Sequence, residues 1–191
     1  IEQTADTRVE AIEAGHDLVL THGNGPQVGD LLLQQEQSND TPERPLDVLV
    51  AQTQAQLGYP LQSALDERLP GDRHATTVVT QTIVDADDPA FEEPTKPVGP
   101  FYTEREAAAQ PFETRCVGNG ERAFRRVVPS PEPREVVERD EIAGLLAEGT
   151  VPICAGGGGI PVVRDDGLRG VAAVVDKDRT SRLLASSLGA E

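Results

Sequence analysis

The sequence is poor in lysine, aromatic residues and sulfur. Two lysines, Lys96 and Lys177, stand against 15 arginines, methionine and tryptophan are absent, and aromatic residues make up 3% of the 191 residues. The net charge of −16 excludes nucleic acid and anionic membranes as natural partners, because both repel an acidic surface. So little lysine on an acidic surface favours a halophilic cytoplasmic protein; a high-GC genome, which favours arginine codons, is the alternative.

Cysteines and long apolar segments are also scarce. Cys116 and Cys154 lie far apart, which excludes a disulfide framework, and their spacing fits no metal site, so we expect no metal held by the protein alone. Cys154 ends an apolar run and is predicted to be a buried thiol. No stretch is long enough to span a membrane and the chain starts without a signal peptide, which predicts a cytoplasmic location.

The scarcity of lysine makes the two that remain informative. Lysine is a compact point charge, whereas arginine is a wide planar fork, so a lysine in an arginine-rich protein can mark a position where arginine does not serve. We therefore predict that Lys96 and Lys177 both contact phosphate. The alternative is that these two lysines were retained by chance. Lys96 lies between prolines in a proline-rich, acidic segment, residues 85–100, which we interpret as an ordered excursion from the main sheet.

The most informative stretch is a predicted strand at residues 17–21 that runs through Gly23, Asn24 and Gly25 into a helix predicted from about 27 to 37. A helix N-terminus offers free N–H groups and a partial positive charge, so it attracts anions, phosphate above all. Glycines let the backbone approach the anion closely. We predict phosphate contact at these three residues; an ordinary strand–helix connection is the alternative.

Two further segments carry candidate site residues. Four glycines follow a strand predicted at residues 150–155. Ordering four glycines costs much conformational entropy, which a structural turn alone explains poorly, so we predict phosphate or substrate contact at Gly156, Gly157 and Gly158. Farther on, Lys177 and Asp178 stand between an apolar strand and a helix predicted from about 179 to 188, where open α/β sheets bind ligands. Lys177 could bridge phosphates while Asp178 orients neighbouring lysines. The alternative is a surface ion pair that contributes little to stability.

The remaining pattern predicts alternating helices and strands. Residues 46–69 have apolar residues at helical spacing, with a break expected near residues 58–60, and this apolar face serves the core or a subunit interface. A single strand is predicted at residues 76–84, another at 123–129, and a helix at 140–147.

Five segments, taken in order, resemble the carbamate kinases of the amino-acid kinase superfamily: THGNGPQVG (21–29), PTKPVGPFY (94–102), RRVVPSP (125–131), AGGGGIP (155–161) and VDKD (175–178). The resemblance implies an α/β fold over residues 1–191: a three-layer αβα sandwich with a mainly parallel central sheet and a protruding subdomain at about residues 85–128. It also implies a homodimer.

The same resemblance implies reversible phosphoryl transfer between carbamoyl phosphate and ADP, giving ATP and carbamate, in arginine or carbamoyl phosphate catabolism. Mg²⁺ would accompany ATP or ADP. Lys177, Asp178 and Lys96 would be the catalytic residues, and the two glycine turns would hold phosphate and carbamate. The alternatives are a related amino-acid kinase with another carboxyl substrate and a non-catalytic phosphate-binding or dimerising module.

One departure concerns the extent of the chain. Members of the family begin with a strand that carries a Gly-Gly-Asn turn, and they continue into a C-terminal part that binds most of the nucleotide. Neither is present in this sequence. We therefore expect an internal piece of a longer protein, and we expect residues 1–191 alone not to make ATP.

Overall fold

The computed structural model describes residues 2–38, 40 and 42–190, with side chains from residue 6 onward. Its helices are α1 (Glu2–Glu13), α2 (Gly25–Gln37), α3 (Leu46–Asp66), α4 (Glu104–Ala108), α5 (Arg139–Ala147) and α6 (Lys177–Leu188), with short 3₁₀ turns at Pro89–Phe91 and Gly156–Gly158. Its strands are β1 (Ala75–Thr77), β2 (Gln81–Val84), β3 (Lys96–Thr103), β4 (Thr114–Cys116), β5 (Arg122–Val128), β6 (Pro133–Val136), β7 (Val151–Ile153), β8 (Ile160–Arg164) and β9 (Leu168–Gly170).

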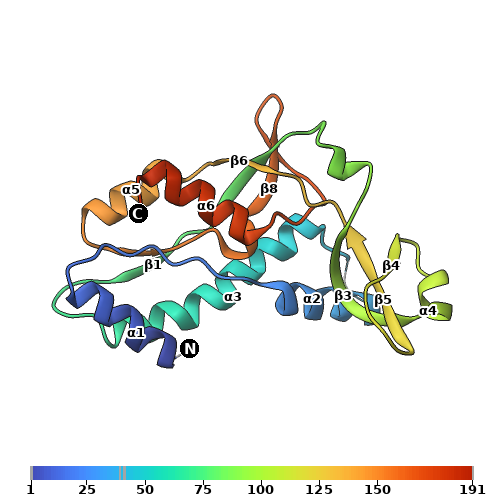
Figure 1. The fold of residues 1–191 in the computed structure, drawn as a ribbon, viewed down its shortest axis with the longest axis horizontal. Helices are drawn as coiled ribbons and strands as arrows, with labels where there is room; N and C mark the ends of the chain where they lie inside the picture. The colour runs from blue at the N-terminus through green and yellow to red at the C-terminus, as the bar shows by residue number, and fades with distance from the viewer. Residues whose placement is uncertain (1, 39, 41, 191) are drawn as a thin grey trace.

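The body of the molecule has three layers, with helices on both faces of the strands (Figure 1). On one face, Val9 of α1 and Leu65 of α3 pack against Ile153 of β7. On the other face, Ile142 of α5 and Leu184 of α6 pack against Cys154. Successive residues of a strand point to opposite faces, so neighbours such as Ile153 and Cys154 feed different helical layers. The predicted α/β sandwich is confirmed.

The strands of the body form a pair, β1–β7, and a four-stranded sheet in the order β6–β2–β8–β9, and the central pairings are parallel. β1 pairs with β7, and β2 pairs with β8, both in parallel, while β6 and β9 are antiparallel additions. Leu20 forms an isolated parallel bridge with Ile153, which is all that remains of the strand predicted at residues 17–21. Its hydrogen bonds run to one side only, from Leu20 N to Pro152 O and from Cys154 N to Leu20 O.

The strand predicted as one piece at residues 76–84 is wrong in that respect, because residues 78–80 interrupt it. The interruption lies beside the glycine turn that separates β7 from β8. The buried amide of Gln54, on α3, takes over the missing pairing: Thr80 N donates to Gln54 Oε1 at 2.7 Å, and Gln54 Nε2 donates to Thr80 O at 3.0 Å. The side chain thus supplies the partner of Thr80 N, while Thr80 O also accepts the N–H of Ile160 at 2.8 Å.

The helix break predicted near residues 58–60 is also wrong, since α3 continues through Pro60 to Asp66. The reason is tertiary packing along its whole length. Leu49 and Val50 are buried in one core cluster and Leu65 in another, so both ends are held against the body. Gly58 lies against Thr77 of β1, where an added Cβ would overlap the threonine side chain.

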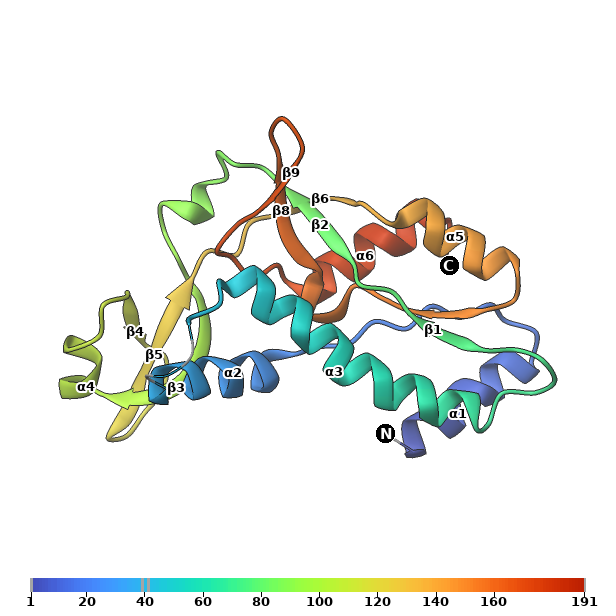
Figure 2. The ribbon, with the colours of Figure 1, turned by 180° about the vertical axis from the view of Figure 1, so that it is seen from behind.

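A separate three-stranded antiparallel sheet, in the order β3–β5–β4, lies at one end of the molecule beside α2 (Figures 1 and 2). Val98 of β3 and Val128 of β5 join Val28 and Leu32 of α2 in one apolar cluster. At its far end, Tyr102 Oη donates a hydrogen bond to Glu36 Oε1 at 2.7 Å. Residues 96–100 of the proline-rich segment therefore lie in an edge strand, β3, and residues 89–91 form a 3₁₀ turn.

Across the part of the chain that the structure describes, no helix combines the length and the apolar character that a membrane span requires.

Candidate active site

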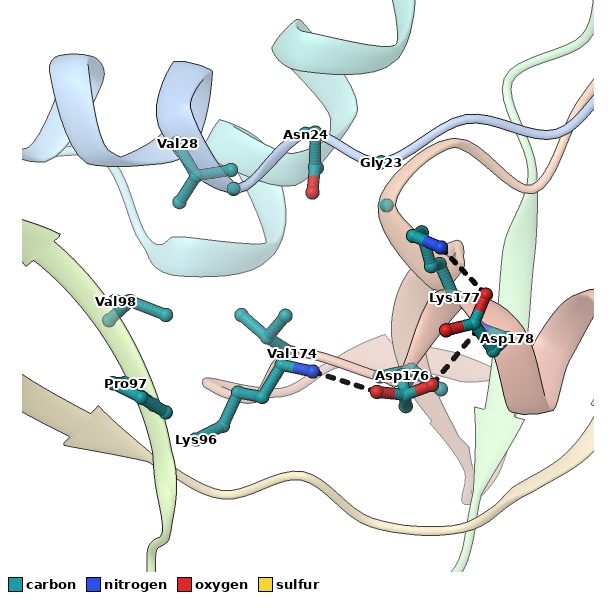
Figure 3. A pocket seen from close by; sticks show the side chains of 13 residues that line it. Gly23, Asn24, Val28, Lys96, Pro97, Val98, Val174, Asp176, Lys177 and Asp178 are labelled. Carbon is teal, nitrogen blue, oxygen red and sulfur yellow. Dashed lines mark hydrogen bonds and ion pairs between the residues drawn. The ribbon is translucent and has the colours of Figure 1, made fainter. Parts of the chain in front are cut away.

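A cavity of about 270 Å³ lies where the N-termini of α2 and α6 meet the first residues of β3 (Figure 3). Both lysines of the chain line it, one from the three-stranded sheet and one from α6. Of the residues predicted from sequence, it brings together Gly23, Asn24, Gly25, Lys96, Gly157, Lys177 and Asp178. Gly156 and Gly158 are buried in the turn behind it and are not part of its lining.

The first glycine turn leaves the N-terminus of α2 open to the cavity. Asn24 is the N-cap residue, yet its side chain accepts no hydrogen bond from the helix backbone. The side chain is 4% exposed, and its Nδ2 donates to Thr53 Oγ1 on α3 at 2.8 Å. Figure 3 shows its amide directed into the cavity. Pro26 has no N–H, so Gly25 and Gln27 carry the first-turn donors that can meet an anion.

The two lysines reach the cavity from different elements, and each is paired with a carboxylate. Lys96 Nζ lies 2.8 Å from Asp176 Oδ2, and Lys177 Nζ lies 2.6 Å from Asp178 Oδ1. The stem of Lys177 passes over Gly23, where an added Cβ would come within 3.2 Å of Lys177 Cδ. An ammonium group has three donors, so each lysine keeps donors for an anion while it is held by its aspartate.

Asp176 is a residue that the sequence reasoning left out of the site. The helix predicted from about residue 179 starts two residues earlier, at Lys177, with Asp176 as its N-cap. Oδ1 of Asp176 accepts hydrogen bonds from Asp178 N at 3.0 Å and Arg179 N at 3.4 Å. The hydrogen bond from Lys96 is the largest factor holding the pKa of this carboxyl below its usual value. An aspartate directly before a helix is an N-cap signal, and that signal could have identified it.

The second glycine turn is built for close packing of the backbone. The N–H groups of Gly157, Gly158 and Gly159 donate within the protein, to His22 O at 2.7 Å, Ala155 O at 3.0 Å and Gly156 O at 3.1 Å. A Cβ on Gly157 would overlap Asn24, and one on Gly158 would come within 2.5 Å of Val175 O. These glycines therefore set the positions of Asn24 and of the segment that carries Asp176. Contact of Gly156, Gly157 and Gly158 with substrate stays a prediction.

Buried polar side chains that no sequence pattern indicated donate hydrogen bonds to the carbonyl groups of this turn. Thr82 Oγ1 and Thr180 Oγ1 both donate to Gly158 O at 2.9 Å, and Gln54 Nε2 donates to Gly156 O at 3.2 Å. All three side chains are buried. His22 lies against Gly156, and burial is the main reason that its pKa is lowered. Only the folded topology brings these distant residues together, so no local sequence signal could have found them.

Among the described residues, no group of three or more histidine, cysteine, aspartate or glutamate side chains could hold a metal ion. Asp178 is 81% exposed at its side chain and borders the cavity. Because Mg²⁺ is commonly bound by one or two carboxylates together with substrate phosphates, this donor set fits an ion that arrives with a nucleotide.

The chain is similar to known proteins in both sequence and fold. The model of the Amino acid kinase family matches residues 1–191. The chain is 55% identical to "Carbamate kinase" of Halobacterium salinarum and 44% identical to "Carbamate kinase" of Pyrococcus furiosus; it is covered completely in both matches and spans 62% and 64% of the two proteins. "Carbamate kinase from Giardia lamblia bound to AMP-PNP" matches with a TM-score of 0.86 and 43% identity, over 99% of this chain and 62% of that one. The chain therefore belongs to the amino acid kinase family.

Proposed function

We propose that this protein transfers a phosphoryl group between carbamoyl phosphate and ADP, forming ATP and carbamate. The observation that carries the proposal is the convergence of both lysines on one cavity, beside the open N-terminus of α2. Sequence relatives that carry the name carbamate kinase support the choice of reaction. Carbamate then decomposes to ammonia and carbon dioxide, and the physiological setting that we infer is arginine or carbamoyl phosphate catabolism.

The residues at the cavity have the properties that phosphoryl transfer requires. This reaction needs little covalent help and depends on positioning and on positive charge around the transferred oxygens. Lys96 and Lys177 would supply the charge, Asp178 would orient Lys177 through their 2.6 Å contact, and the N–H groups at the start of α2 would bind phosphate oxygens. Mg²⁺, carried by the nucleotide and bordered by Asp178, would neutralise the phosphates.

The cavity wall favours a small substrate over an amino acid. Val28, Val98 and Val174 form its apolar side, and carbamoyl phosphate ends in a small amide beside the phosphate. An N-acetylated amino acid would bring a longer chain, an acetyl group and a second carboxylate, and the three valines offer none of its polar atoms a hydrogen-bond partner. This apolar side therefore favours the smaller substrate.

Further properties belong to the same proposal. The three-stranded sheet, with its connections at about residues 85–128, would be the subdomain that carries Lys96 over the substrate. The protein would be a homodimer; Tyr59 on α3, which is 75% exposed, marks an apolar contact that a second subunit could cover. Its acidic surface would suit a salt-rich cytoplasm.

A direct assay tests the proposed reaction. ATP formation from carbamoyl phosphate and ADP is measured for residues 1–191 and for the protein expressed from its complete open reading frame, with acetylglutamate and ATP as a rival substrate pair. We expect ATP from carbamoyl phosphate with the complete protein. Phosphorylation of acetylglutamate, or no turnover of either pair by the complete protein, would contradict the proposal and favour the related kinase or the non-catalytic module.

A further inference from the structure

Asp176 binds one lysine of the cavity and caps the helix that carries the other (Figure 3). Its Oδ2 accepts a hydrogen bond from Lys96 Nζ, on β3, at 2.8 Å. Its Oδ1 caps α6, the helix that begins at Lys177. The pair is half-buried, with side chains 35% and 32% exposed for Lys96 and Asp176. Burial of this kind lessens the screening by salt that weakens exposed pairs.

The backbone of Asp176 is held by contacts on both sides of the residue. Its main-chain carbonyl accepts the N–H of Thr180 at 3.1 Å within α6. The preceding residue, Val175, is buried, and its carbonyl packs against the Cα of Gly158 so closely that only glycine fits there. The carboxylate is therefore attached to the rigid body, whereas Lys96 belongs to the three-stranded sheet. The ion pair connects these two parts at the cavity.

We propose that Asp176 is a positioning residue, whose carboxylate holds the Lys96 ammonium at the cavity wall and anchors the first turn of α6, so that both lysines are in place before the phosphorylated substrate binds. This inference rests on the proposed function. The stem of Lys96 has four rotatable bonds, and holding its ammonium in advance removes part of the ordering cost of binding. Two of its three N–H donors stay available to phosphate oxygens.

A competing interpretation predicts the opposite change in the KM for carbamoyl phosphate. If Asp176 competed with the substrate for Lys96, its removal would tighten substrate binding. If Asp176 positions Lys96, its removal weakens binding. Uniform loss of binding raises KM and leaves kcat nearly unchanged.

The variant Asp176→Asn separates the ion pair from the helix cap, because asparagine caps helices about as well as aspartate but carries no charge. Asp176→Ser is a second variant that caps but has too short a side chain to reach Lys96. Asp88→Asn is the matched control: Asp88 also accepts two backbone N–H groups, from Ala90 and Glu132, and it lies outside the cavity lining.

The first readout uses the two lysines as internal reporters. Trace acetylation with acetic anhydride, followed by mass spectrometry, measures the labelling rate of each lysine in residues 1–191 and in the complete protein. Loss of a half-buried, charge-assisted pair should raise the rate at Lys96 about fivefold in Asp176→Asn and Asp176→Ser. Lys177, which pairs with Asp178, should stay within about twofold of its wild-type rate, and Asp88→Asn should alter neither lysine.

The second readout is steady-state kinetics of the complete protein. KM for carbamoyl phosphate should rise about fivefold in both Asp176 variants, with kcat within about twofold of wild type. An unchanged or lowered KM, or unchanged labelling of Lys96, would overturn the inference. Inactivity of the wild-type protein would instead refute the proposed function, and the labelling experiment would still decide the role of Asp176.

Discussion

Gly157→Ala should damage both stability and activity, because this glycine lies directly against Asn24. Gly157 has a φ of +65°, and an added Cβ would overlap the side-chain amide of Asn24. Asn24 is buried and donates to Thr53 Oγ1 at 2.8 Å, so it has little room to move without losing that hydrogen bond. The substitution therefore forces a choice between a displaced glycine turn and a displaced Asn24.

The expected cost has three parts. Alanine in the left-handed region costs about 1–2 kcal/mol. Overpacking of a filled site costs about 1–3 kcal/mol. A buried hydrogen-bonding group left without its partner costs about 1–3 kcal/mol. The last two parts belong to the contact with Asn24 alone, so together they set the effect of the clash at about 2–6 kcal/mol. This is a large share of the roughly 5–15 kcal/mol by which a domain is stable.

Gly71→Ala is the matched control, because Gly71 has a φ of +66° and nothing within 4 Å of an added Cβ. Both variants carry the same backbone strain, and only Gly157→Ala carries the clash. Urea-induced unfolding should show Gly157→Ala less stable than Gly71→Ala by about 2–6 kcal/mol, with a loss of ATP formation confined to Gly157→Ala. Equal losses of stability at the two positions would refute the packing argument.

Three further predictions concern charge. Lys177→Ala should lower kcat about 10²-fold or more, because the proposed role of Lys177 is to meet the charge of the transferred group. Lys96→Ala should mainly raise KM for carbamoyl phosphate, and wild-type kinetics in either variant would remove that residue from the proposed mechanism. The melting temperature should rise from low salt to molar KCl, because salt screens the repulsion within a chain of net charge −16, and a flat or falling curve would leave codon bias as the explanation. Burial raises the pKa of Cys154 from 9.0 to about 12, so the free energy of unfolding should fall as pH rises through that window; Cys154→Ala should flatten the curve, and an equal slope in both proteins would contradict this cause.

The local patterns predicted much of the fold. Periodicity and flanking glycines placed α5 and β5 within a residue or two of their observed bounds, and the buried thiol of Cys154 is confirmed. These features depend on residues that are close in sequence, where helix and strand periods leave a clear signal. The errors at the break in α3 and at the single strand of residues 76–84 arise where Gln54 meets the distant backbone of Thr80 and Gly58 meets the side chain of Thr77. The strand predicted at residues 17–21 is reduced to one bridge at Leu20.

The candidate site was predicted in outline for a similar reason. Glycine turns and scarce lysines are visible in the sequence, and the structure gathers seven of the predicted residues at one cavity. Asp176 was missed because its importance comes from Lys96, 80 positions away in the chain. Likewise, the second glycine turn was interpreted through its possible ligands, whereas its packing against Asn24 and Val175 requires the folded structure.

Phosphorus NMR of the reaction mixture is the decisive test of the proposed phosphoryl transfer between carbamoyl phosphate and ADP. Carbamoyl phosphate, ADP and Mg²⁺ are followed over time with the complete protein and with its Lys177→Ala variant. We predict that the carbamoyl phosphate signal decays as the γ-phosphate signal of ATP grows by the same amount, and that the variant slows both. Decay into inorganic phosphate without ATP, or equal rates in the two proteins, would contradict the account.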